Sequence, residues 1–184
     1  MHAVVALLFF LVQPFWETKP PEKWTDEEVG IVLTASPWIG HTRGEAASTV
    51  YFATAGPIQQ AEAELRRRSK NEPPDPDYVD YLQEHRDEVF VLAIAYAKPV
   101  PLSAVEIRRM DEQTEMKIGK KPYRILGHFA PTPADPVLRL VFPRTVKATD
   151  KLVEFKLYVP GLPFPERDVS FYVQDLLFRG TLEM

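Results

Sequence analysis

The sequence of 184 residues contains no cysteine. This absence excludes disulfides, thiolate catalysis and zinc or iron–sulfur sites with cysteine ligands. It is compatible with export, because no thiol is present to mispair in an oxidising compartment. Glycine is scarce as well, with 8 residues, and neither a P-loop nor a G-x-G-x-x-G pattern occurs. We therefore expect no glycine-rich loop that holds a phosphate group.

Long apolar runs are also missing. The longest, Ala3 to Val12 (AVVALLFFLV), is much shorter than the roughly 20 apolar residues needed to cross a bilayer, but it fits the apolar part of a signal peptide. No Lys or Arg precedes it and no A-x-A cleavage pattern follows. We expect residues 1–16 to be a signal peptide and the protein to be exported, periplasmic or extracellular. The alternative is a cytoplasmic protein whose first residues belong to the core.

The rest of the chain is long enough for one compact domain and too short for two. Residues 17–23 contain two prolines and are predicted to be an extended linker. Residues 24–184 then form a single domain. The net charge of the whole chain is −4, from 22 Lys and Arg against 26 Asp and Glu, which argues against a dedicated nucleic-acid-binding protein. The basic groups at residues 66–70 and 117–124 are interpreted as a helix end and a solvated hairpin.

The residues from Val137 to Met184 form four short apolar runs bounded by Pro, Gly or charged residues. Runs of this length, rich in β-branched and aromatic residues, are typical of strands. Their short connections favour antiparallel neighbours. A further run, Val89 to Ala97, is apolar on both faces and predicts a central strand. The expected fold class is α+β: a mainly antiparallel sheet with a C-terminal β-meander and three to four helices on one face.

Helix starts are marked by side chains that cap backbone N–H groups. Thr25 with Glu28, and Ser103 with Glu106, match the capping-box pattern. Pro57 and Asp75-Pro76 mark two further helix starts. In the helix that begins near Pro57, the residues Ile58, Ala61 and Leu65 are predicted to share the buried face.

The most unusual loop is SPWIGHTRGE, residues 36–45, which combines Trp38, His41, Arg43 and Glu45. A metal site there lacks a third or fourth ligand, so a solvated loop is favoured over it. The acidic group near residue 75 lacks the glycine and glutamate positions of a calcium loop. No serine lies in a nucleophile elbow. We expect no catalytic residue, no metal and no cofactor, and we take Trp38, His41 and Arg43 as candidate ligand-binding residues.

Two functions remain open from the sequence. The first is an exported, non-catalytic interaction or assembly module that binds another protein through a free sheet edge. The second is a small-ligand binding protein or hydrolase with a pocket near the Trp38-His41-Arg43 loop. Neither involves nucleic acid or a stable membrane span.

Three short motifs complete the sequence pattern: WTDEE at residues 24–28, SPW at residues 36–38, and Phe142-Pro143 before the closing aromatic-rich strands. In these motifs the chain resembles an uncharacterised family of predicted exported bacterial proteins. The resemblance implies export and a single domain. Because that family carries no established activity, it implies no catalytic residue here.

Overall fold

A computed structural model describes residues 13–42, 48–69, 75–96 and 102–184. These residues contain five α-helices, two 3₁₀-helices and eleven strands, so the α+β class with mainly antiparallel pairing is confirmed. The α-helices are α1 (Phe15–Thr18), α2 (Asp26–Ala35), α3 (Gly56–Ser69), α4 (Pro76–His85) and α5 (Ala104–Gln113). No helix of the described residues has the length and apolar character that a membrane span requires.

The strands divide between two main sheets and one short hairpin. The first sheet has the order β1-β2-β3-β7-β6, where the strands are β1 (Ile39–His41), β2 (Thr49–Phe52), β3 (Val89–Ala95), β6 (Gly127–Phe129) and β7 (Val137–Pro143). The second has the order β5-β4-β8-β9, where the strands are β4 (Glu115–Ile118), β5 (Lys121–Arg124), β8 (Leu152–Tyr158) and β9 (Glu166–Tyr172). The hairpin joins β10 (Leu177–Phe178) to β11 (Thr181–Leu182).

The capping signals in the sequence form the helix starts that they predict. The Thr25 hydroxyl accepts from the Glu28 N–H at 3.1 Å while the Glu28 carboxylate accepts from the Thr25 N–H at 2.6 Å. Ser103 and Asp75 accept backbone N–H groups at the starts of α5 and α4. These caps satisfy donors that a helix start otherwise leaves unpaired.

The main core lies between the two sheets and is rich in phenylalanine. The central ring, Phe52, is fully buried and lies with its centroid 4.6 Å from that of Phe171 and 5.7 Å from that of Phe90. Phe155 of β8 contacts Phe52 and Phe142 as well. Because these rings come from both sheets, their burial holds the two sheets face to face.

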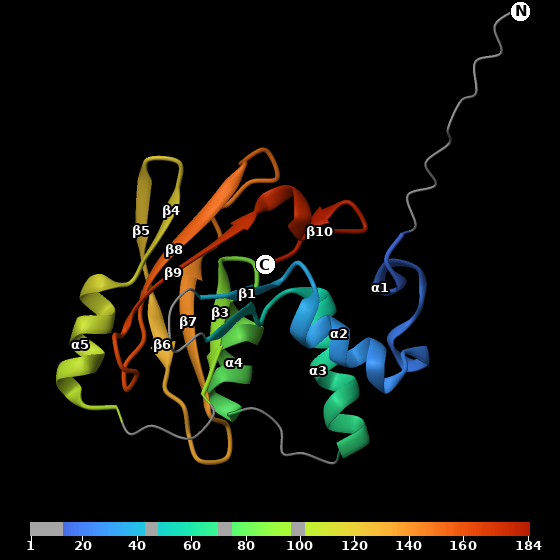
Figure 1. Ribbon diagram of the computed structural model, residues 1–184, viewed down its shortest axis with the longest axis horizontal. Coiled ribbons are helices and arrows are strands. Elements are labelled where there is room, and N and C mark those ends of the chain that lie inside the picture. The colour runs from blue at the N-terminus through green and yellow to red at the C-terminus, as the bar shows by residue number, and fades with distance from the viewer. Residues whose placement is uncertain (1–12, 43–47, 70–74, 97–101) are drawn as a thin grey trace, which may run out of the picture.

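Strand β3 is covered on both sides, as its uniformly apolar sequence predicts. Phe90, Leu92 and Ile94 belong to the core between the sheets. Val91 and Ala93 belong to a second apolar cluster, with Tyr78 and Leu82 of α4 packed on it. Helix α4 therefore covers the outer face of the first sheet, and it overlaps β3 in the view of Figure 1. Helix α5 lies at one end of the molecule and α2 and α3 at the other (Figure 1).

Arg68 links α3 to the start of α2. Arg68 contacts Asp26 at 2.6 Å and Glu64 at 2.9 Å, and it donates to the Trp24 carbonyl at 2.8 Å. Hydrogen bonds from Arg67 and Arg68 lower the pKa of Glu64 to about 2. Ile58 and Ala61 are buried as expected, but Leu65 is 44% exposed, because Glu64 occupies the protected side of this turn.

The carboxy-terminal residues brace two distant parts of the fold. The Glu183 carbonyl accepts from the Trp38 indole N–H at 2.9 Å, and its carboxylate accepts from the Gly56 N–H at the start of α3 at 3.0 Å. The Met184 carbonyl accepts from Arg144 at 3.4 Å, and the Met184 side chain is buried.

Residues 15–23 are more ordered than the predicted linker. Phe15 and Trp16 of α1 make edge-to-face contacts with Trp24 and Trp38, at centroid distances of 5.8 and 6.2 Å. A 3₁₀-helix forms at Pro21–Lys23. The aromatic contacts explain the difference, because burial of these rings stabilises local turns that prolines alone do not specify. The expected boundary between the signal peptide (residues 1–16) and the linker therefore falls inside α1. The first 12 residues of that expected signal peptide lie outside the described residues.

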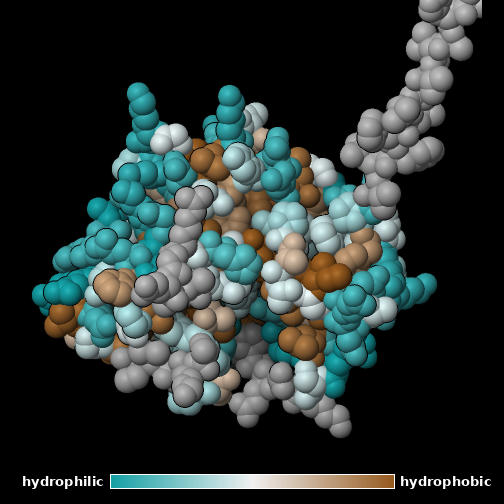
Figure 2. Space-filling model, viewed as in Figure 1, coloured by the Kyte–Doolittle hydropathy of each residue, from teal (hydrophilic) through white to brown (hydrophobic). Residues whose placement is uncertain are grey.

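Figure 2 shows the surface on the face seen in Figure 1. Hydrophobic side chains are visible there in small groups separated by hydrophilic ones. Large exposed apolar side chains in the described residues include Phe164, Val105, Tyr172 and Leu126. Such scattered exposure is ordinary for a folded domain. Hollows lined by charged groups are therefore the more informative features.

Candidate functional site: a cationic cleft between two helices

The three residues that the sequence proposes as a ligand site differ in their surroundings. Trp38 is fully buried, with its ring against Trp16 and Phe178, and it borders a hollow beside α1. His41 is exposed at the end of β1 and is paired in register with Thr49. Arg43 lies outside the described residues, so its grouping with the other two stays a prediction.

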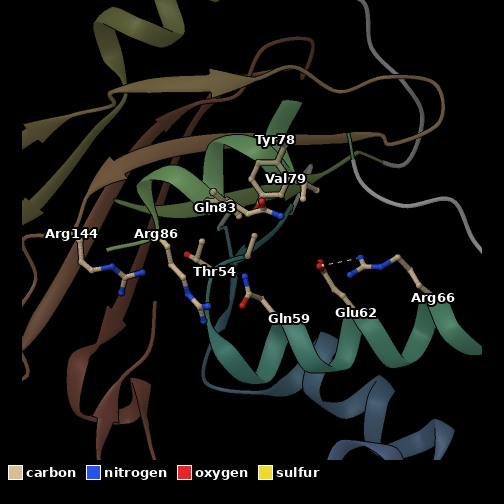
Figure 3. Close-up of a pocket in the computed structure, with 11 residues that line it drawn as sticks. Thr54, Gln59, Glu62, Arg66, Tyr78, Val79, Gln83, Arg86 and Arg144 are labelled. Atoms are coloured by element: carbon tan, nitrogen blue, oxygen red, sulfur yellow. Dashed lines mark ion pairs between the residues drawn. The ribbon is translucent and has the colours of Figure 1, made fainter. Parts of the chain in front are cut away.

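A different hollow has the chemical features of a binding site. It is a cavity of about 430 Å³ between α3, α4 and the first sheet. We call it the cationic cleft, and it is lined by Ala53, Thr54, Gln59, Glu62, Arg66, Tyr78, Val79, Leu82, Gln83, Arg86 and Arg144. Three of these residues are arginines and one is a carboxylate, in a chain whose net charge is −4. Figure 3 shows the side chains in place.

One wall of the cleft is a polar face of α3. Gln59, Glu62 and Arg66 recur at helical spacing, on a different side of the helix from the buried Ile58 and Ala61. Glu62 and Arg66 form an ion pair at 3.5 Å (Figure 3). This wall therefore presents an amide and a carboxylate whose charge is largely balanced.

The opposite wall is α4, and the floor is the end of β2. Tyr78 and Leu82 provide the apolar part of the wall. On the floor, the Thr54 hydroxyl accepts from the Val91 N–H at 2.9 Å, which fixes its rotamer. A hydroxyl held in this way still offers its own O–H as a donor.

Arg86 and Arg144 form the strongly positive end of the cleft. Figure 3 shows both guanidiniums on the same side of Thr54, and no carboxylate among the labelled side chains lies between them. Arg144 is fixed by donation to the Val89 carbonyl at 3.1 Å and to the Met184 carbonyl. Burial lowers the pKa of Arg144. The charges of Glu183 and Asp87 oppose this by raising the pKa, and the charge of Arg86 lowers it further. Arg86 is exposed, and its side chain makes no hydrogen bond or ion pair with another described residue.

Behind the α4 wall lies a fourth guanidinium. Arg139 is buried, pairs with Asp135 at 2.8 Å and lies 4.4 Å from the centroid of the Tyr78 ring. Burial alone would lower the pKa of Arg139, but the hydrogen bond and charge of Asp135 hold it above its usual value. The stacked guanidinium fixes the orientation of Tyr78 at the edge of the cleft.

The two acidic groups of the cleft, Glu62 and Tyr78, both resist ionisation. Burial raises the pKa of Glu62, and the charges of Arg66 and Arg139 oppose this only in part. Burial also raises the pKa of Tyr78 above its usual value, so its phenol stays protonated near neutral pH. Loss of the Glu62 charge would leave Arg66 without its ion-pair partner and would make the cleft more positive. The cleft is thus built to remain positive.

This arrangement suits binding of a negatively charged group. Guanidiniums form charge-assisted, often paired hydrogen bonds with carboxylates and phosphates. Val79, Leu82 and the Tyr78 ring offer an apolar surface for the remainder of a ligand. A cluster of three or more His, Asp or Glu side chains that could hold a metal ion is not found among the described residues.

The cationic cleft is absent from the sequence-based candidates. Its lining comes from four separate stretches, and only the fold brings Arg86 and Arg144 together. Part of the signal is present, because the polar positions 59, 62 and 66 recur at helical spacing beside an apolar face. Nothing in the sequence links that face to Arg144.

Comparison with known proteins gives no relative: no protein-family model, no curated protein and no solved structure matches this chain.

Proposed function

We propose that this protein is a non-catalytic binding protein for a small organic anion, which it holds in the cationic cleft. The observation that carries the proposal is the pair of guanidiniums, Arg86 and Arg144, facing one cavity in a chain that is acidic overall. Arg86 is exposed, so solvent screens part of the repulsion between the two cations, and an anion bound between them would be attracted by both. The ligand class is therefore a carboxylate or phosphate attached to an apolar or aromatic body.

The cleft favours binding over catalysis. No histidine lines it, Glu62 is paired with Arg66, and the Tyr78 phenol is protonated. A nucleophile next to a general base is therefore not found among the described residues that line it. The groups that remain are donors and apolar walls, which hold a ligand without transforming it.

The test is titration calorimetry with phenyl phosphate and benzoate as probes, at constant ionic strength. Benzyl alcohol is the neutral control of similar size. We expect saturable binding of the anions and none of the alcohol. Arg86→Gln should weaken anion binding about tenfold or more, since a hydrogen bond to a charged group contributes about 1.5–3 kcal/mol. Arg108→Gln, an exposed arginine on α5, is the matched control and should leave binding unchanged. Equal anion affinity in both variants would refute the proposal.

A second candidate is an interaction module, and one feature of the topology favours it. The continuous stretch from Lys121 to Phe129 forms β5 at the edge of one sheet and β6 at the edge of the other, with the 61%-exposed Leu126 between them. Its Lys121 and Arg124 suit an extended acidic segment of another protein, added as a strand. Pro122 limits pairing along β5, so β6 is the better edge.

This second proposal has its own experiment. If the protein is exported, as we propose from the sequence, the partner belongs to the cell envelope. Cross-linking in envelope fractions should recover an acidic partner with the natural chain and with Leu65→Asp, an exposed control position. The substitution Leu126→Asp should abolish recovery. Recovery that is insensitive to Leu126→Asp would rule out this edge.

A further inference from the structure

A second hollow, of about 580 Å³, lies beside Trp38 at the amino-terminal end of the described domain. It is bordered by α1, by the segment that leads into β1, and by the end of β9. We call it the acidic hollow and define it by Trp16, Glu17, Trp38, Phe171, Tyr172 and Asp175. Its chemistry is independent of the cationic cleft, because the two share no residue.

Aromatic rings form the walls of the acidic hollow. Tyr172 is 63% exposed and points away from the core, since residues alternate along β9 and its neighbour Phe171 is buried. Trp16 is partly buried and meets the Trp38 ring edge-to-face at 6.2 Å. Trp38 and Phe171 thus form the back of the hollow, while Trp16 and Tyr172 present surface to a ligand.

The charged groups of the acidic hollow are all negative. Glu17 comes from α1 and Asp175 from the 3₁₀-helix that follows β9. No lysine, arginine or histidine is among the described residues that line the hollow. Neither carboxylate makes a side-chain hydrogen bond or an ion pair within the described part of the chain. The two carboxylates, beside the exposed Tyr172 ring and the partly buried Trp16 ring, therefore lack a positive partner.

We infer that the acidic hollow binds a small organic cation with a methylated ammonium group. Aromatic faces attract such cations through the negative charge of the π-system, and this attraction is strongest for weakly hydrated ammonium groups. The carboxylates add attraction without the full set of oxygen ligands that a calcium or magnesium ion requires. A hydrated metal ion gains little from the rings, whereas a methylated ammonium group packs against the rings and is also attracted by the carboxylates.

The probe is choline, followed by tryptophan fluorescence and by titration calorimetry. The neutral control is 3,3-dimethylbutan-1-ol, which has the same shape without the charge. We expect saturable binding of choline and little of the alcohol. Tyr172→Ala should weaken choline binding about threefold to thirtyfold, the range of a cation–π contact. Its exposure makes this change compatible with folding, which circular dichroism checks.

Charge variants complete the test. The double substitution Glu17→Gln, Asp175→Asn should weaken choline binding about tenfold, and the effect should shrink in high salt. Asp168→Asn removes an exposed carboxylate from the same strand β9, outside the hollow, and should leave binding unchanged. Absence of saturable choline binding, equal binding of the neutral alcohol, or equal loss in Asp168→Asn would each overturn the inference. Arg86→Gln should not alter choline binding, which separates this result from the fate of the cationic cleft.

Discussion

The cationic cleft and the acidic hollow are similar in size but opposite in charge. The cleft, of about 430 Å³, carries three arginines and one carboxylate between α3, α4 and a sheet. The hollow, of about 580 Å³, carries two carboxylates and no basic residue among its described lining. The net charge of −4 predicts neither. Ligand preference in this protein is therefore set by local placement of side chains, and the following changes separate the two regions.

The largest effect is expected from the core that both regions share. Phe52→Ala removes the ring that contacts Phe90, Phe155 and Phe171, and it should lower the free energy of unfolding by about 3–5 kcal/mol. Denaturant unfolding measures this change, with the exposed Leu65→Ala as control. Both probes should lose binding in parallel as the variant unfolds. A loss confined to one probe would show that the two regions are stabilised separately.

A charge reversal in the cationic cleft should affect that region alone. Arg86→Glu replaces attraction for an anion with repulsion, and it should reduce phenyl phosphate binding by about 2–3 kcal/mol. Calorimetry measures the affinity, with Arg108→Glu on α5 as the control of equal charge change. Choline binding should stay the same in both variants. If Arg108→Glu weakened phosphate binding equally, the attraction would come from total charge and not from the cleft.

A glycine substitution should disturb the packing behind the acidic hollow. A Cβ atom on Gly40 would lie 2.6 Å from side-chain atoms of Phe171 and Val169. Gly40→Ala should therefore shift Phe171 and destabilise the fold by about 1–3 kcal/mol. Gly30→Ala, in α2 with open space around the new Cβ, should stabilise by up to about 1 kcal/mol. Thermal unfolding of the pair measures both signs, and a neutral Gly40→Ala would contradict the tight packing.

The smallest effect concerns pH and Glu62. Because its folded pKa is raised by burial, Glu62 becomes neutral on acidification before an ordinary carboxyl group does. Phenyl phosphate itself gains a proton at about pH 6, so the effect of Glu62 is the difference between the natural chain and Glu62→Gln. Glu62→Gln should bind the probe more tightly at neutral pH, by about 1 kcal/mol or less, and this difference should vanish as pH falls through the raised value of Glu62.

The same group affects stability with a defined sign. Glu62 ionises at lower pH in the unfolded chain, so its contribution to stability falls as pH rises from the ordinary value of 4.5 through the raised folded value. Glu62→Gln should flatten this part of the stability–pH curve, as measured by denaturant titration. An unchanged curve would mean that Glu62 is well solvated.

Local features of the fold could be predicted from the sequence because their causes are local. The capping pairs at Thr25 and Ser103 depend on residues three apart. The box at Thr25 forms in full, and at Ser103 the hydroxyl accepts the Glu106 N–H as expected while the Glu106 carboxylate accepts from that hydroxyl. The alternation in β8 and β9, and the two-sided burial of β3, follow from hydrophobic periodicity. The fold class follows from the order of these elements.

The pairing of the strands could not be predicted in the same way. Periodicity indicates which face of a strand is buried, but not which partner covers it. The division into two sheets depends on the stretch Lys121–Phe129, which leaves one sheet and joins the other at Ile125 and Leu126. The last apolar run, Leu176 to Met184, also differs from a simple strand. It starts where a 3₁₀-helix ends and then forms a hairpin of two strands, each two residues long.

The candidate site was the least predictable part. Trp38 stood out in the sequence for its unusual neighbours, yet its ring is fully buried in the core. Arg86 and Arg144 belong to unremarkable stretches, and their proximity arises only when β7 pairs with β3. Export remains a proposal, which the mature amino terminus of protein from its host would test, and the family resemblance remains a prediction.

The Glu183–Met184 brace has a practical consequence. One backbone carbonyl of this dipeptide holds the indole behind the acidic hollow, and the next holds a guanidinium of the cationic cleft. A purification handle or fluorescent reporter attached directly after Met184 would disturb the hydrogen bonds to Trp38 and Arg144 at once. Reporters for either ligand are better attached at turns such as the one at Gly119, where a side chain would meet no atom within 4 Å.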